Sequence, residues 1–305
     1  MSLTSITSLE ILQYAFMQRA LLAAVLVGIT APTVGVYLVQ RRLALIGDGM
    51  GHVALTGVAL GFLTGRAPVL TALAVAVLGA IAVERVRAHG RTSADVALAV
   101  LFYGGIAGGV LLVSLSTNGN MAALNGYLFG AITTTSHADL VTFALLAVAV
   151  LAVTVGLSPR LFAVSNDEEW AQASGLPVLG LNLLLAVTTA TTVVISMRVV
   201  GLLLISALMI LPNAIAQQLA GSFRTTLALA VGVGLVSSLA GVTTSFYANT
   251  PSGATIVVFC IGLFLLVAVG VAAVQATAGR RHRPAEAHLR EHGQPQVAQG
   301  TEGRR

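Results

Sequence analysis

The chain has 305 residues, of which 56% are hydrophobic and 9% are charged, and its mean hydropathy is +0.92. Soluble domains carry roughly 25% charged residues, so this composition excludes a water-soluble globular protein. The apolar runs are also far longer than the ~10-residue strands of a membrane barrel. We therefore expect an all-α, polytopic bundle of membrane helices. The net charge of +5 does not predict a nucleic-acid partner, because the arginine residues fall at the ends of apolar segments.

Apolar stretches of roughly 17–25 residues can cross a bilayer as helices. The sequence contains about nine such spans (eight to nine), at 16–39, 44–64, 67–84, 95–115, 138–158, 177–197, 199–220, 225–246 and 253–276. The stretch 118–136 is only partly apolar and favours a short re-entrant or interfacial helix.

The spans define a transmembrane domain at 16–278, which follows an N-terminal segment at 1–15. Placing Arg41 and Arg42 in the cytoplasm leaves only Arg19, Arg66 and Arg198 on the outer side. Cytoplasmic loops carry the excess of basic residues, so we expect a multi-pass protein of the inner (plasma) membrane. Its segment 1–15 is predicted to be extracytoplasmic and its C-terminus cytoplasmic.

The last segment, 279–305, is rich in Arg, Glu, Gln, Gly and Pro. Such a composition cannot bury a core, so we expect a disordered cytoplasmic tail. The tail holds His282, His288 and His292, either as ordinary polar residues or as a loose metal-scavenging tract.

Two ionisable residues lie inside the second span. Asp48 and His52 are four positions apart, so their side chains project from the same helix face. An ionisable group in hydrocarbon is costly and usually faces the bundle interior or a substrate path. A carboxylate and an imidazole on one face can share a divalent metal ion. The alternative is that Asp48 caps or pairs within the bundle and His52 is a core histidine. His137 and Asp139, near the outer end of the fifth span, either line an entrance or face water.

The loop 158–177 carries the signals of a short helix. Ser165 with Glu168 matches a capping box, and Asp167, Glu168 and Glu169 favour the positive end of a helix dipole. Gly175 can adopt the left-handed conformation that ends a helix. We therefore predict a helix of about two turns on the cytoplasmic face.

This short helix has two interpretations. It carries Trp170 and Ala171, and an exposed tryptophan is often an anchor at the membrane interface. Alternatively, the helix docks into a soluble partner.

Pro212 lies inside the seventh span, where it removes a helix hydrogen bond and kinks or breaks the helix. It is a candidate hinge, with a static kink as the alternative. Small residues at helix-packing spacing predict close backbone contacts in two other spans: Gly57, Gly61 and Gly65, and Gly104, Gly105, Gly108 and Gly109.

Three stretches, 16–53, 167–175 and 200–216, carry a resemblance to a known family. With them the chain resembles the permease subunits of ABC transporters that import zinc, manganese or iron. The resemblance extends to about Ala278. The family commonly has Gly-Asp-Ala-x-Ser-His, of which this chain keeps Asp48 and His52 but has Gly49 and Gly51 at the Ala and Ser positions.

A second departure from the family lies in the third stretch. The usual Pro-Ala-Ala-Thr-Ala begins here with Pro212 followed by Asn213.

The resemblance implies a homodimeric permease embedded in membrane lipid. It also implies two ATP-binding subunits on the cytoplasmic face and an extracytoplasmic metal-binding protein. The short helix would then be the coupling helix that fits a groove of the ATPase, through Asp167, Glu168, Glu169, Trp170, Ala171 and Gly175. Arg160 and Arg224 could rim that contact. The chain carries no P-loop motif, so we expect a transport subunit and not an enzyme, with ATP hydrolysis on a partner chain.

One Asp and one His are too few to hold a metal ion. A two-fold axis would bring two copies of Asp48 and His52 together, and two oxygen and two nitrogen ligands suit Zn²⁺ and accept Mn²⁺ or Fe²⁺. The predicted function is import of a divalent metal ion, zinc first, with manganese or iron import as the alternative. The metal is the cargo, and no permanently bound cofactor is expected.

Two other classes fit less well. A proton-coupled transporter would need its own membrane carboxylates, of which only Asp48 is clear. An intramembrane metallohydrolase would need a third ligand and a general base.

Overall fold

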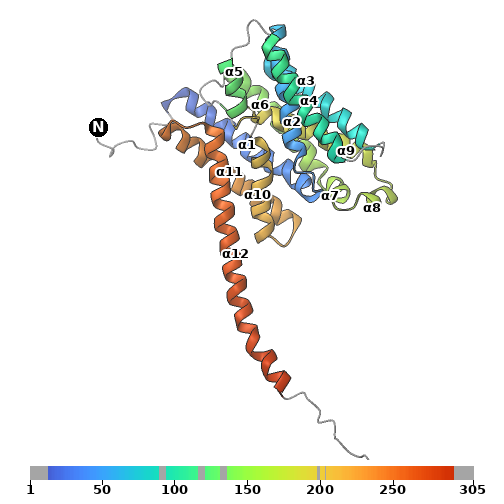
Figure 1. Cartoon of the computed structure of the whole chain (residues 1–305), viewed down its shortest axis with the longest axis vertical. Coiled ribbons are helices and arrows are strands. Elements are labelled where there is room, and N and C mark those ends of the chain that lie inside the picture. The colour runs from blue at the N-terminus through green and yellow to red at the C-terminus, as the bar shows by residue number, and fades with distance from the viewer. Residues whose placement is uncertain are drawn as a thin grey trace, which may run out of the picture. The chain divides into compact units, whose positions relative to one another are not determined.

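The structure is a computed structural model that describes residues 13–88, 94–115, 121–130, 136–197, 200–202 and 204–291, with the backbone alone at 94–95, 121–124 and 277–291. Each regular element in this part of the chain is a helix (Figure 1). In chain order they are α1 (Ala15–Gln40), α2 (Ile46–Thr64), α3 (Pro68–Ala88), α4 (Ala94–Leu115), α5 (Met121–Phe129), α6 (His137–Gly156), α7 (Ser158–Asn166), α8 (Glu168–Ala173), α9 (Val178–Ser196), α10 (Ile205–Leu219), α11 (Phe223–Ala248) and α12 (Ser252–Glu291).

Eight helices in the described residues are long and apolar enough to cross a membrane: α1, α2, α3, α4, α6, α9, α11 and the Ser252–Ala276 part of α12. The predicted all-α, polytopic bundle is confirmed. The partly apolar stretch 118–136 contains the predicted short helix, α5. Helix α7 was not predicted, because its nine residues are too few and on average too polar to stand out from the loop.

The seventh predicted span is shorter than its sequence suggests. Helix α10 has 15 residues, about 22 Å at 1.5 Å per residue, against a hydrocarbon core of roughly 30 Å. The chain before it turns at Gly201, whose φ is +90°. The N–H of Leu202 donates to the carbonyl of Tyr127 in α5, over 2.9 Å. A non-helical segment is tolerated at membrane depth only where the protein satisfies its polar groups, and α5 does so here.

The chain divides into two compact units, 1–264 and 265–305. The second unit contains the continuation of α12, which is helical as far as Glu291. Residues 279–291, predicted as disordered tail, are therefore helical in the structure. The side chains of His282 and His288, and all of 292–305, lie outside the described residues, as do 1–12. The three-part domain division remains a prediction.

The most buried spans of the first unit are α1, α2 and α9. In their most apolar windows 72%, 72% and 61% of the residues are buried. Helix α2 packs against α3 and α4, and α1 packs against α10 and α11 (Figure 1). The span that carries Asp48 and His52 is therefore central to the bundle.

Glycines let α2 approach both of its neighbours, as their spacing predicts. A Cβ at Gly57 would lie 2.8 Å from the carbonyl oxygen of Thr71 in α3, and one at Gly105 would lie 2.6 Å from the backbone of His52. Gly65 and Gly104 do not share this role, because a Cβ at either would meet nothing within 4 Å. Gly65 instead ends α2 in the left-handed conformation, with a φ of +65°.

Candidate metal site and coupling helix

A tight turn at the end of α1 places Asp48 in the first turn of α2. The N–H of Leu43 donates to the carbonyl of Leu38 (2.9 Å), and that of Arg42 donates to Val39 (3.1 Å). Arg42 is left-handed, with a φ of 58°. This is the Schellman pattern of helix termination. Asp48 follows at the positive end of the α2 dipole, which favours a carboxylate.

His52 lies deeper in the bundle than Asp48. It is 7% exposed, whereas Asp48 is half-buried. The imidazole packs edge-on against the ring of Phe102 in α4, with centroids 4.3 Å apart. Gly105, nearly one turn further along α4, lies against the His52 backbone. The structure thus supports a buried imidazole next to an accessible carboxylate, and their joint role as metal ligands remains a prediction.

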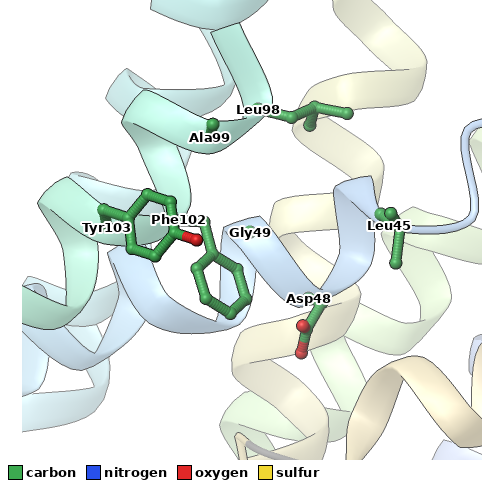
Figure 2. Close-up of a pocket in the computed structure, with 7 residues that line it drawn as sticks. All are labelled: Leu45, Asp48, Gly49, Leu98, Ala99, Phe102 and Tyr103. Carbon is green, nitrogen blue, oxygen red and sulfur yellow. The ribbon is translucent and has the colours of Figure 1, made fainter. Parts of the chain in front are cut away.

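A cavity of about 430 Å³ opens beside Asp48, lined by Leu45, Asp48, Gly49, Leu98, Ala99, Phe102 and Tyr103. Figure 2 shows these residues on two segments, the start of α2 with the preceding Leu45, and the facing part of α4. The Phe102 ring lies between Asp48 and Tyr103 in this view. Asp48 is the one carboxylate in this mostly apolar lining. A small cation that enters the cavity would therefore contact the negative charge of Asp48.

Ser206 of α10 is a partner of Asp48 that sequence reasoning missed. Its Oγ donates to Oδ1 of Asp48 over 3.2 Å. From the resemblance, a serine hydroxyl would be expected directly before His52, but position 51 is glycine. A Cβ at Gly51 would lie 2.9 Å from the carbonyl oxygen of Leu202, so the α9–α10 connection occupies that space. A hydroxyl reaches the site from α10 instead.

In the part of the chain that the structure describes, one copy brings together too few ligands for a metal ion. Within the described residues, no group of three or more His, Cys, Asp or Glu side chains is placed to hold one. Asp139, the other carboxylate considered, takes part in a capping box with Ser136 at the start of α6. His137 is exposed and Asp139 is half-buried.

The predicted short helix exists as α8, but a different residue caps it. Asp167 is the N-cap, and its Oδ1 accepts a hydrogen bond from the N–H of Trp170 over 2.9 Å. The predicted capping role of Ser165 is wrong, because α7 extends through that position and buries it. Gly175 ends the helix as predicted, with a φ of +80°. The N–H groups of Gly175 and Leu176 donate to carbonyls of α8 in a second Schellman pattern.

The predicted coupling residues point in different directions. Asp167, Glu169 and Trp170 are exposed, and Trp170 is 59% exposed. Ala171 is fully buried and faces the bundle. Glu168 turns toward the end of α1. The surface that α8 offers to a partner therefore excludes Ala171, and contact with an ATPase remains a prediction.

Glu168 forms a closed ring of contacts with Arg41 and Asn182. One guanidinium nitrogen of Arg41 donates to Glu168 Oε2 over 2.8 Å, and the other donates to Asn182 Oδ1 over 2.7 Å. Asn182 Nδ2 in turn donates to Glu168 Oε1 over 3.0 Å. Burial, followed by the charge of Arg87, lowers the pKa of Arg41, and the carboxylates of Glu168 and Glu84 oppose that shift.

The segments that were predicted to be cytoplasmic also contact one another elsewhere. Phe162 of α7 packs on Phe223 of α11 with centroids 4.8 Å apart. A polar cavity of about 450 Å³ is bounded by the end of α3, α8 and the start of α9. Arg160 and Arg224 are exposed near the aromatic contact. These contacts bring the segments together in the first unit. Their assignment to the cytoplasmic side remains a prediction.

Pro212 lies within α10, which continues as a helix on both sides. The adjacent Asn213 is fully buried and donates through Nδ2 to the carbonyls of Pro32 (3.0 Å) and Met209 (2.8 Å). Two proline-containing helices, α1 and α10, are therefore joined beside their prolines. The departure from the family's alanine at 213 thus has a structural role, and a hinge at Pro212 remains a prediction.

In the described residues, eight helices can cross a membrane, a central span carries the polar pair, and α8 is a short helix with an exposed side, all of which fit a membrane transport subunit. Residues 13–271 match the family model described as the ABC 3 transport family. The chain belongs to this family, and the predicted resemblance is confirmed. It is therefore a membrane subunit of an ABC transporter and a multi-pass protein of the plasma membrane.

Similar proteins agree with this assignment. The manganese transport system membrane protein MntC of Halalkalibacterium halodurans is 32% identical over 84% of this chain and 88% of its own length. The high-affinity zinc uptake system membrane protein ZnuB of Haemophilus influenzae is 28% identical over 81% of this chain and 94% of its own length. A solved structure, PsaBC from Streptococcus pneumoniae in complex with Fab, is 29% identical with a TM-score of 0.77, covering 86% of this chain and 95% of that one.

Proposed function

We propose that the chain is the permease of an ATP-driven importer for a divalent metal ion, with zinc as the first candidate. Two copies of the chain would pair so that two Asp48 carboxylates and two His52 imidazoles bind the metal together. The observation that carries this proposal is the pairing of a buried imidazole with a cavity-lining carboxylate in a central span. A mixed oxygen and nitrogen ligand set suits Zn²⁺.

The partners of this proposal follow from the family. An ATP-binding subunit would dock on α8 through Asp167, Glu169 and Trp170, and an extracytoplasmic protein would deliver the metal from the other side. The C-terminus would then be cytoplasmic. ATP binding and hydrolysis on the partner would change the position of α8 and so open the site to the cytoplasm.

Manganese is the second candidate cargo. The relative named for manganese transport is more similar over its aligned length than the one named for zinc. The same ligand atoms accept Mn²⁺, because selectivity among these ions depends on geometry and availability. Iron is the third candidate, since another relative carries iron transport in its name.

The test is metal uptake by proteoliposomes that contain the chain with its ATPase and its binding protein. We expect ATP-dependent uptake of one metal, lost in both Asp48→Ala and His52→Ala. Thr64→Ala, at the far end of the same helix, is the matched control, because its hydroxyl bonds only to carbonyls of its own helix. Uptake that persists in both ligand variants would contradict the site. Uptake without the ATPase would favour a proton-coupled transporter.

A further inference from the structure

The ring formed by Arg41, Glu168 and Asn182 joins three helices at one point. Arg41 directly follows α1, Glu168 is the first residue of α8, and Asn182 lies in the first turns of α9. All three contacts are 3.0 Å or shorter. The side chain of Arg41 is only 6% exposed, whereas that of Glu168 is 49% exposed. The ring therefore has a buried side, at Arg41, and an exposed side that belongs to the proposed docking helix.

The guanidinium of Arg41 suits this role because its planar fork can donate to two partners in fixed geometry. A lysine would offer a point charge on a flexible stem. Asn182 completes the ring by accepting from Arg41 and donating to Glu168. Each of the three side chains is hydrogen-bonded to the other two. These bonds hold α8 in a defined position at the end of α1.

The backbone from Arg41 to the metal site is short and constrained. Arg41 is followed at once by the Schellman turn, in which Arg42 is left-handed. Helix α2 begins at Ile46, and Asp48 lies in its first turn. A displacement of Arg41 would therefore move the first turn of α2 and the carboxylate in it. A contact that joins α8 to the start of α2 can couple the docking helix to the metal site, if its arrangement differs between the two states of the transporter.

We infer that Arg41 is a positioning residue that transmits the movement of α8 to Asp48, through its contacts with Glu168 and Asn182. This inference rests on the proposed function, because it requires an ATPase that moves α8. It adds a direct connection from the docking helix to the metal ligand that does not pass through the length of any membrane span. The ring couples ATP hydrolysis to release of the metal.

The experiment measures metal uptake per ATP hydrolysed, and the stimulation of ATPase activity by metal, in the reconstituted full complex. The variants are Arg41→Gln, Glu168→Gln and the double variant. Arg66→Gln is the matched control, since Arg66 is exposed and follows the far end of α2, outside the ring and its connection to Asp48. We expect each ring variant to lower uptake per ATP by about tenfold, within the usual range of coupling between sites. The control should stay within about twofold of wild type.

The double variant separates a shared connection from two independent defects. If Arg41 and Glu168 act through one ring, the double variant should lose no more than either single variant. Metal affinity, retention of the ATPase and thermal stability are measured alongside, because a merely structural role would change those and leave uptake per ATP intact. The inference would be overturned if the losses of the two single variants multiplied in the double variant. It would also be overturned if Arg41→Gln behaved like the Arg66→Gln control.

A second variant keeps the test decisive if Arg41→Gln does not assemble. Arg41→Lys keeps the positive charge but cannot reach Glu168 and Asn182 with one planar group, so uptake per ATP should fall by about threefold within an intact complex. Full coupling in Arg41→Lys would overturn the inference. A wild-type complex without ATP-driven metal uptake would instead overturn the proposed function itself.

Discussion

Ser206 donates a hydrogen bond from its hydroxyl to Oδ1 of Asp48, across 3.2 Å and from a helix 158 residues further along the chain. The contact ties the first turn of α10 to the first turn of α2. It also leaves the second carboxylate oxygen of Asp48 free of Ser206. Because this bond restricts the rotamer of Asp48, the second oxygen would already be oriented when a metal binds.

Replacing Ser206 with alanine should weaken metal binding without unfolding the protein. A neighbour that orients a metal ligand typically contributes 10–100-fold to affinity. Because this bond is long, we expect about a tenfold increase in the dissociation constant. Titration of the purified protein with metal against a chromophoric chelator measures this constant. Ser114→Ala is the matched control, since that hydroxyl bonds to the Leu111 carbonyl of its own helix. Equal affinity in both variants would show that Ser206 does not orient Asp48.

Pro212→Ala distinguishes a hinge from a static kink. The substitution restores a helix N–H in α10, and a proline in a helix interior costs about 3 kcal/mol. We expect a gain in the free energy of unfolding of up to that size and, if α10 bends during transport, a slower uptake. Pro68→Ala is the control, because Pro68 is the first residue of α3, where proline breaks no helix hydrogen bond. Faster or unchanged uptake in a stabilised Pro212→Ala variant would support the static kink.

The two glycines between Asp48 and His52 should respond differently to alanine. A Cβ at Gly49 would lie 2.9 Å from the flexible end of the Leu101 side chain, whereas one at Gly51 would lie 2.9 Å from the backbone oxygen of Leu202. Gly49→Ala should change the free energy of unfolding by less than about 1 kcal/mol, since alanine also favours the helix. Gly51→Ala should lower it by about 1–3 kcal/mol through overpacking. Unfolding of the two variants in the same detergent compares them directly, and equal stability would contradict the close approach of Leu202.

Gly175→Ala tests the end of α8. Its φ of +80° is left-handed, and a Cβ there would meet nothing within 4 Å, so the cost is a backbone cost of about 1–2 kcal/mol. We expect weaker binding of the ATPase, because the last turn of α8 loosens. Gly156→Ala, in equally open space at the end of α6, is the control and should bind normally. The affinity of the membrane subunit for the purified ATPase is the measurement, and equal affinity in both variants would exclude a role for this turn in docking.

Local sequence signals predicted the parts of this fold that depend on short stretches of chain. The long apolar runs predicted the spans, because bilayer thickness fixes the length of a spanning helix. Gly175 predicted the end of α8, since few residues other than glycine adopt its conformation. The pair Asp48 and His52 stood out because ionisable residues are rare in such helices.

The remaining features depend on contacts between distant segments, which a single sequence does not contain. The shortness of α10 follows from the hydrogen bond between Leu202 and Tyr127. The hydrogen bond from Ser206 to Asp48 likewise joins two segments that are far apart in the sequence. The cap of α8 moved from Ser165 to Asp167 because α7 takes up the preceding residues as a helix of its own. Ser165 lies inside α7, so Asp167, the single residue between the two helices, is the N-cap of α8.

The absence of a side chain at Gly105 has a consequence for how metal preference could be altered. Because α4 rests directly on the backbone of His52 there, and Phe102 packs on the imidazole from the same helix, α2 and α4 form a single rigid block around the candidate ligands. In the proposed metal site, residues of α4 that do not bind the ion would therefore set the positions of the two ligands. Substitution of α4 side chains such as Phe102 by larger or smaller ones would then change the preferred size of the cargo, while the two proposed ligands stay unchanged.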